Sequence, residues 1–213
     1  MYNSPVARYT RPCLDLFVKV CYNNLTDKQE FDGRMEMYLW IAIDVNEQIR
    51  ELRENAENYI KNHELTSPTL TLPFHISLKI SFQISSDILK EVTYDIREFC
   101  KSLKQFTITV KSIEKTDTII WLTMQDSAYL TAIHNRLDQL LLEKYGVVQH
   151  EFDKSFIFHT SILITNSKEH LNAAFEAIKD VNIPNVLNAQ KIIIGSSKEG
   201  QPGTYSVFEE IML

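Results

Sequence analysis

Hydrophobic residues follow two kinds of spacing along this chain, and the elements they predict occur twice in the same order. Apolar runs at 37–43 and 118–124 predict buried strands, because short continuous runs bounded by polar residues suit a buried position in a sheet. Apolar residues three or four positions apart follow each run and predict amphipathic helices at about 46–60 and 128–145. A strand followed by a helix is therefore the first part of a repeated unit.

Each unit continues with an apolar strand that contains a polar tripeptide. The strands at 72–80 and 156–164 are apolar except around a His-x-Ser sequence. Because residues i and i+2 of a strand point to the same side, the histidine and serine share one face and their neighbours take the other. Helices at about 86–103 and 171–178 follow these strands. The polar pairs are His75 with Ser77 and His159 with Ser161.

The spacing of tryptophan and histidine also indicates a duplication. Trp40 lies 35 residues before His75, and Trp121 lies 38 residues before His159. We therefore expect an α+β domain of two lobes with pseudo-twofold symmetry, in which antiparallel sheets are flanked by helices. The two His-x-Ser strands are expected to face each other across a central groove.

This single bilobal domain is expected to occupy residues 35–213, with lobes at roughly 35–105 and 106–213. Two strands in the tail, at 189–195 and 204–212, surround a turn rich in Ser and Gly and complete the sheets.

Residues 1–34 are expected to form an extension that packs on the main domain. Apolar positions alternate at 14–20 and predict an edge strand or arm. The first residues lack the apolar region of a secretory signal. No run approaches the roughly 18 apolar residues of a membrane span. We therefore expect a cytoplasmic protein with no membrane partner.

Composition limits the partners of the protein. The 213-residue chain can bury a sizeable core, and its 44% hydrophobic and 23% charged content is ordinary for a soluble globular protein. A net charge of −6 disfavours broad capture of long nucleic acid, so no DNA partner is expected, whereas a short or terminal nucleotide is still allowed. The three cysteines show neither metal-type pairing nor a disulfide framework, which favours a reducing compartment. We expect a monomer.

The paired tripeptides suit in-line displacement at phosphorus. One imidazole removes a proton from the attacking oxygen and the other donates a proton to the leaving oxygen, which a side chain of pKa about 6.5 can do near neutral pH. The hydroxyls of Ser77 and Ser161 would hydrogen-bond the non-bridging phosphate oxygens and stabilise their charge. His75 and His159 are the candidate acid and base, and the scheme requires no metal.

Two observations support this interpretation over a chance match and over zinc binding. A single His-x-Ser sequence is usually incidental, but two copies occupy matching places in a repeat. A zinc site normally needs three protein ligands, and no Asp, Glu or Cys accompanies either motif on its strand face. No metal or other cofactor is therefore expected. The other histidines, none of which has serine two residues later, are His63, His134, His150 and His170.

With these features the chain resembles the 2H phosphoesterases, the group that includes 2′-5′ RNA ligase-like proteins and cyclic nucleotide phosphodiesterases. The resemblance covers roughly residues 35–213 and includes the opening strand and helix, both H-x-[S/T]-x motifs, and the closing strands with Tyr205. It implies that the two histidines are catalytic and that the two serines bind phosphate. Both hydroxyls are serine, where threonine is common in the family.

The resemblance implies an RNA-processing hydrolase. This would be a metal-independent phosphodiesterase acting on 2′,3′-cyclic phosphates or 2′-5′ phosphodiester bonds of RNA ends or small nucleotides. Two alternatives stay open, namely the reverse reaction, 2′-5′ RNA ligation, and a nucleotide- or RNA-binding module without turnover. Intact His and Ser at all four motif positions argue for turnover. The near-symmetric motifs do not assign acid and base, and the preferred base is also undetermined.

Four more residues are candidates for lining the groove. On a regular strand Lys79 would share the face of Ser77 and bring positive charge to the phosphate, or it would reach solvent from the strand end. Tyr38, Trp40 and Tyr205 could stack on a base, although aromatic residues in apolar strands more often belong to the core.

Overall fold

The computed structural model describes residues 35–213, and the extension at 1–34 with its predicted strand at 14–20 lies outside the described residues. The strands are β1 (Glu36–Asp44), β2 (His75–Ser85), β3 (Phe106–Lys115), β4 (Ile119–Met124), β5 (His159–Ile164), β6 (Val186–Ala189), β7 (Lys191–Ser197) and β8 (Ser206–Met212). The α-helices are α2 (Arg50–Asn62), α3 (Leu89–Lys101), α4 (Ala128–Tyr145) and α5 (Lys168–Ile178). Short 3-10 helices are η1 (Asn46–Ile49), η2 (Pro68–Leu70), η3 (Ser86–Ile88) and η4 (Glu151–Ser155).

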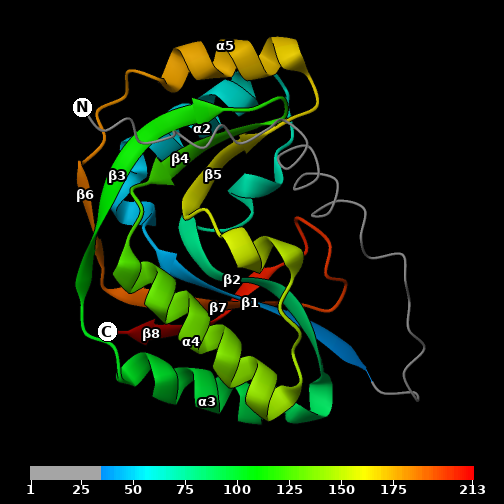
Figure 1. Ribbon diagram of the computed structural model, residues 1–213. Helices are drawn as coiled ribbons and strands as arrows, with labels where there is room; N and C mark the ends of the chain where they lie inside the picture. Colours follow the sequence, from blue (N-terminus) through cyan, green and yellow to red (C-terminus); the bar gives the residue numbers. More distant parts are fainter. Residues whose placement is uncertain (1–34) are drawn as a thin grey trace.

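The strands form two antiparallel sheets of four strands each (Figure 1). The first sheet has the order β2-β1-β7-β8, and the second has the order β5-β4-β3-β6. Helices α3 and α4 contact the first sheet, whereas α2 and α5 contact the second. Because α2 follows a strand of the first sheet and α4 follows a strand of the second, the two halves of the chain exchange helices.

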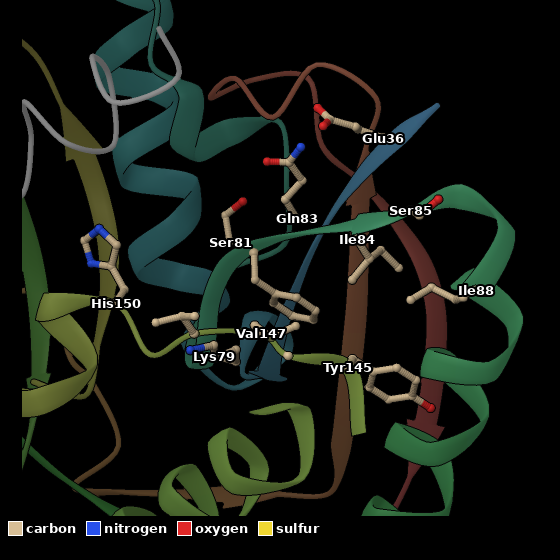
Figure 2. Close-up of a pocket in the computed structure, with 13 residues that line it drawn as sticks. Glu36, Lys79, Ser81, Gln83, Ile84, Ser85, Ile88, Tyr145, Val147 and His150 are labelled. Atoms are coloured by element: carbon tan, nitrogen blue, oxygen red, sulfur yellow. The ribbon is translucent and has the colours of Figure 1, made fainter. Parts of the chain in front are cut away.

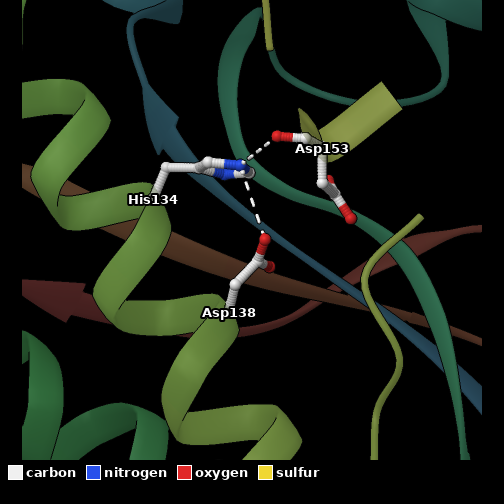
Figure 3. A group of neighbouring side chains, drawn as sticks. All are labelled: His134, Asp138 and Asp153. Atoms are coloured by element: carbon white, nitrogen blue, oxygen red, sulfur yellow. Dashed lines mark hydrogen bonds and ion pairs between the residues drawn. The ribbon is translucent and has the colours of Figure 1, made fainter. Parts of the chain in front are cut away.

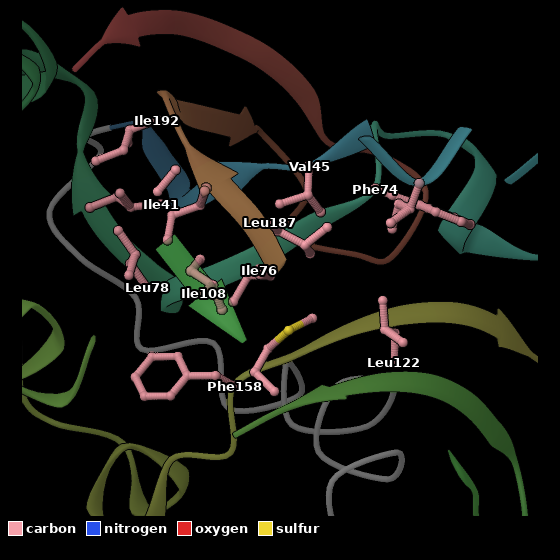
Figure 4. Packing of buried hydrophobic residues seen from close by; sticks show 14 of the residues in the cluster. Ile41, Val45, Phe74, Ile76, Leu78, Ile108, Leu122, Phe158, Leu187 and Ile192 are labelled. Carbon is pink, nitrogen blue, oxygen red and sulfur yellow. The ribbon is translucent and has the colours of Figure 1, made fainter. Parts of the chain in front are cut away.

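The exchange of helices gives the two sheets a common core. Buried side chains from both sheets and from all four α-helices belong to one packed cluster. Figure 4 shows Ile41 and Leu78 of the first sheet in this cluster together with Leu122 of the second sheet and Phe158, which precedes β5. Removing apolar surface of both sheets from water in one place stabilises their relative position as well as each sheet.

The predicted class, α+β with two lobes of antiparallel sheet and flanking helices, is confirmed. The predicted ends of α4 are also confirmed: the Ser127 hydroxyl accepts a hydrogen bond from the Leu130 amide, and Gly146, with φ of 67°, ends the helix in the left-handed conformation. Strand β6 was not predicted, because a run of four residues carries too little periodicity.

Within residues 35–213, none of the helices has the length and apolarity needed to cross a bilayer.

A bulge in β2 makes the prediction for Lys79 wrong. Ala42 pairs with Ser77, but the next residue back along β1, Ile41, pairs with Lys79, so β2 holds one extra residue between these pairs. An extra residue reverses the alternation of faces, which sends the lysine to the core side. Lys79 is only 2% exposed, so it neither joins Ser77 nor reaches solvent.

The buried lysine belongs to a cluster of four ionisable side chains. Its Nζ atom lies 2.7 Å from a carboxylate oxygen of Asp138 on α4 and 2.5 Å from one of Asp153 on η4. The fourth member is His134, whose Nδ1 atom faces the carbonyl oxygen of Leu78 at 2.7 Å. Its Nε2 atom faces the carbonyl oxygen of Asp153 at 3.2 Å (Figure 3). The cluster therefore holds two basic and two acidic side chains in contact with one another and with the backbone.

Replacing Lys79 should reveal the cost of leaving two carboxylates buried without their cation. We expect Lys79→Met to lower the free energy of unfolding by about 3–5 kcal/mol, the usual effect of removing one partner of a buried ion pair. Urea unfolding measures this change. Leu163 is the matched control, because it follows Ser161 by two residues, is also buried, and also lies beyond a bulge. Leu163→Met should cost less than about 1.5 kcal/mol, and equal losses in the two variants would contradict the expectation.

Candidate active site

The two His-x-Ser strands contact each other although they belong to different sheets. Strands β2 and β5 are each at one edge of their sheet, and residues of the two strands lie close together. The structure therefore brings His75 and His159 onto neighbouring strands, and Ser77 and Ser161 follow on the same faces. All four side chains are partly exposed.

A backbone hydrogen bond sets the tautomer of each histidine. The Nδ1 atom of His75 lies 2.7 Å from the carbonyl oxygen of Pro73, and the Nδ1 atom of His159 lies 2.7 Å from that of Ile157. Because a carbonyl oxygen only accepts, Nδ1 carries the proton in both rings. Nε2 of each neutral ring is then the basic nitrogen, so the two motifs present the same atom for proton transfer.

A tryptophan from the neighbouring strand packs against each histidine. Trp40 stacks on His75 with ring centroids 4.5 Å apart, and the ring centroids of Trp121 and His159 are 4.8 Å apart. Both indoles are buried, so each shields part of an imidazole from water and limits its rotation. Trp40 therefore lies in the core, which is where aromatic residues of apolar strands are usually found, and not on an open surface where a base could stack.

Trp40 packs closely against its own sheet to reach His75. It clusters with Ala42 and with Ile193 of β7, and it pairs in register with Gly195 of the same strand. A Cβ atom at Gly195 would lie 2.0 Å from the indole Nε1 atom. Only glycine therefore allows the ring to lie in this place without moving.

Burial lowers the pKa of both candidate histidines, because loss of water disfavours the charged ring. The pKa of His159 falls to about 4; the hydrogen bond to Ile157 opposes the fall, and charge on His75 adds to it. The pKa of His75 is also lowered by burial, but its hydrogen bond to Pro73 and the carboxylate of Asp44 oppose the lowering. Asp44 pairs with His75 across the two strands. The pKa values of the two rings are therefore perturbed to different extents although the motifs look alike.

Tyr38 and Tyr205 lie near the turn between β7 and β8. The Tyr38 ring packs so closely on Gly200 that a Cβ atom there would lie 2.8 Å from the ring. The Tyr205 hydroxyl contacts the Ser81 hydroxyl and donates to the carbonyl oxygen of Gly200 at 3.3 Å. Both tyrosines thus fasten the turn against the first sheet, and both remain partly exposed.

Three side chains with metal-ligand chemistry gather around the buried Lys79. One ligand atom from each of His134, Asp138 and Asp153 lies within 4.8 Å of the others, and all three residues are buried. The ammonium group of Lys79 contacts both carboxylates. The lysine therefore supplies the positive charge that a metal ion would bring to this group.

A cavity of about 610 Å³ lies elsewhere, between β2 and the segment that follows α4 (Figure 2). Ser81 and Gln83 line it from the strand, and Val147 and His150 line it from the other side. Neither candidate histidine contributes to its lining.

Several features of the site were not evident from the sequence. The carbonyl groups of Pro73 and Ile157 belong to the backbone, so no side-chain pattern reveals them. Asp44 ends an apolar strand, and only the strand pairing places it opposite His75. The packing of Trp121 on His159 could have been anticipated, because the duplication already matched it with Trp40.

The fold is similar to several solved two-lobed structures. A structure of TT0787 from Thermus thermophilus has a TM-score of 0.53 and 14% identity, covering 83% of this chain and 97% of that one. A structure of E. coli LigT complexed with 3′-AMP has a TM-score of 0.51 and 18% identity, covering 84% and 98%. A Bacillus licheniformis protein, named as an inferred phosphoesterase, is 26% identical over 108 residues. That match covers 47% of this chain and 62% of the bacterial protein.

Two antiparallel sheets that meet at a pair of His-x-Ser edge strands define a protein of the two-histidine class. A family model described as the 2′-5′ RNA ligase superfamily matches residues 41–201. The chain belongs to this superfamily, and the resemblance to 2H phosphoesterases drawn from the motifs is confirmed.

Titration of the two histidines should follow from their surroundings. In NMR spectra we expect the His159 ring to gain a proton only near its pKa of about 4 and His75 to gain one at a higher pH, because Asp44 favours charge on His75. An unfolded histidine binds a proton below about 6.5, so between about pH 6.5 and 4 the unfolded state takes up more protons. The free energy of unfolding should therefore fall as the pH falls through this window. A His159 resonance that titrates near 6.5 would contradict this assignment.

Adding one methyl group at Gly195 should displace Trp40 from His75. We expect Gly195→Ala to lower the free energy of unfolding by about 1–3 kcal/mol, the usual cost of overpacking, and to change the tryptophan fluorescence. Ser196→Ala at the neighbouring position is the control and should leave the fluorescence unchanged. Wild-type fluorescence and stability in Gly195→Ala would contradict the close packing of the Trp40 indole on Gly195.

Proposed function

We propose that the protein is a metal-independent phosphodiesterase that opens 2′,3′-cyclic phosphates or 2′-5′ phosphodiester bonds of RNA ends or small nucleotides. The observation that carries this proposal is the matched geometry of His75 and His159. Both rings lie on contacting edge strands, and both have Nδ1 bound to a backbone carbonyl. Two basic Nε2 atoms are thus available for proton transfer on either side of a reacting phosphate.

The reaction we propose is an in-line attack of water on a cyclic phosphodiester. Nε2 of one neutral histidine takes a proton from the water as its oxygen bonds to phosphorus. Nε2 of the other, protonated histidine gives its proton to the ribose oxygen as the P–O bond breaks. The product is a phosphomonoester, and the two rings have exchanged protonation states. Ser77 and Ser161 would hydrogen-bond the non-bridging oxygens, where negative charge accumulates.

Charge around the two rings favours His75 as the acid and His159 as the base. The Asp44 carboxylate favours a positive charge on His75, whereas burial together with charge on His75 lowers the pKa of His159 to about 4. In the free protein burial keeps both rings neutral near pH 7. A bound phosphate anion raises the pKa of the ring it contacts, which would let His75 carry the proton when substrate is present.

Membership of the superfamily supports a phosphoester substrate, and E. coli LigT has been crystallised with 3′-AMP. A nucleoside monophosphate of that kind would be a product of the proposed reaction when a 2′,3′-cyclic nucleotide is opened at the 2′ oxygen. The net charge of −6 is consistent with a small or terminal nucleotide rather than a long polyanion.

Replacing either histidine should remove the activity. We expect His75→Ala and His159→Ala each to lower the turnover of a 2′,3′-cyclic nucleotide by at least about 100-fold, the usual contribution of one acid or base. Turnover is followed by separating the cyclic nucleotide from its monophosphate. The control is His63→Ala, because His63 is exposed and lies at the end of α2. Full activity in either active-site variant would rule out the two-histidine mechanism.

Chelation and product analysis separate the remaining alternatives. Because no step of the proposed reaction uses a metal, activity should persist in EDTA, and its loss would favour a metal-dependent reaction. If RNA cleaved to a 2′,3′-cyclic end is joined instead of hydrolysed, the protein is a ligase. If a nucleoside monophosphate binds but no cyclic or 2′-5′-linked substrate is opened, it is a binding module.

A further inference from the structure

The two halves of the chain place a basic side chain at matching positions of their first helices. Among the buried residues of each helical segment are four apolar ones with the same spacing, and a basic residue follows the second of them while an acidic residue follows the third. In the first half these are Arg53 and Glu57, and in the second half they are His134 and Asp138. The buried residues are Ile49, Leu52, Ala56 and Ile60 in one half and Leu130, Ile133, Leu137 and Leu141 in the other.

Arg53 holds the loop that enters β2. Its guanidinium donates to the carbonyl oxygens of Leu72 at 2.8 Å and Leu70 at 3.2 Å. It also lies over the ring of Phe74, 5.2 Å from the ring centroid. Glu57 accepts from Nε at 2.5 Å and fixes the orientation of the guanidinium plane. Arg53 therefore contacts this loop before and after Pro73, the residue whose carbonyl accepts from His75.

Asn46 ties the same arginine to the backbone at Phe74. Its Oδ1 atom accepts from Arg53 at 2.8 Å and from the Phe74 amide at 3.1 Å. The two residues on either side of Pro73 are thus bound to one guanidinium, directly or through one amide side chain. Because both neighbours are held, the orientation of the Pro73 carbonyl depends on Arg53.

His134 makes the corresponding contacts to the segment that enters β5. Its ring stacks on Phe156 with centroids 4.4 Å apart and meets Phe158 edge-on at 6.3 Å. Its Nε2 atom faces the carbonyl oxygen of Asp153 at 3.2 Å. Ile157 lies between the two phenylalanines, and its carbonyl accepts from the second candidate histidine. As in the first half, the residues on both sides of the accepting carbonyl contact one basic side chain of a helix.

We propose that Arg53 and His134 are a matched pair of positioning residues, each of which fixes the backbone carbonyl that sets the tautomer of one candidate catalytic histidine. Arg53 acts through Pro73 on His75, and His134 acts through Ile157 on His159. This inference rests on the proposed function for its catalytic consequence, but the tautomers can be observed without any substrate. Neither residue touches the reacting atoms.

The test is a crossed comparison of tautomers by ¹⁵N NMR of the histidine rings at a pH where both are neutral. In the wild type both rings should show the Nδ1–H form. We expect Arg53→Met to give a mixture of tautomers at His75 and leave His159 unchanged. His134→Gln should give a mixture of tautomers at His159 and disturb His75 much less, since His134 meets the strand of His75 only at the carbonyl of Leu78. If substrate is turned over, kcat should fall by about 10–100-fold in both variants, because misplacing a reacting group by a fraction of an ångström has effects of this size, while KM changes little.

Two further variants separate positioning from general destabilisation. Arg136→Gln removes a guanidinium that lies 5.2 Å from the centroid of Phe99, a contact of the same kind on α4, and should leave both tautomers as in the wild type. Arg53→Lys keeps the charge but loses the two-pronged geometry, so it should restore the His75 tautomer only in part.

The possible results test this inference and the proposed function independently. Wild-type tautomers in both Arg53→Met and His134→Gln, or equal disturbance of both rings by each variant, would overturn the inference. If the wild type opens no phosphodiester, the proposed function fails, but a crossed tautomer pattern still supports the positioning role. Should His134→Gln fail to fold, the Arg53 variants alone decide through the contrast between His75 and His159.

Discussion

The hydrogen bond from each histidine Nδ1 atom to the carbonyl two residues earlier is the interaction on which the site depends. It leaves Nε2 as the basic atom in both rings, and it does so twice with the same 2.7 Å distance. An imidazole that lies partly buried against an indole and bound at Nδ1 has little freedom to rotate. The scaffold therefore determines which nitrogen meets a phosphate before any ligand arrives, and this lowers the reorganisation needed during the reaction.

The exchange of helices explains how two sheets can present these rings to each other. Strands β2 and β5 lack a hydrogen-bonded neighbour on one side within the described sheets, and they meet there because the core is shared. The Lys79 cluster connects β2 with α4 and with η4, the 3-10 helix that precedes β5. Burying four ionisable groups costs desolvation energy that a hydrophobic cluster would not. What the cluster adds is specificity, because its ion pairs and hydrogen bonds form only in one arrangement of strand, helix and loop.

Much of the site could be predicted from the sequence because strand geometry is simple where it is regular. A period of two placed His75 with Ser77 and His159 with Ser161, and the repeated order of elements gave the α+β class and the two lobes. The same rule failed at Lys79, since a bulge of one residue reverses the faces and nothing in the sequence marks it. The long-range contacts also escaped prediction. In the sequence Arg53 resembles an ordinary exposed arginine of a helix. Only the structure shows that the loop before His75 packs against it.

The duplication gives the two halves equal geometry and unequal surroundings. Equal geometry places two Nε2 atoms for proton transfer, and two coupled rings share a single proton over a range of pH even when they are alike. Unequal surroundings decide which ring holds that proton. The differences lie outside the motifs. Asp44 lies beside His75 and favours its charged form, whereas the pKa of His159 is lowered to about 4. The matching basic residue of the helix is a partly buried arginine in one half and a buried histidine in the other. We infer that the motifs supply the symmetric part of the mechanism and that their surroundings supply its direction.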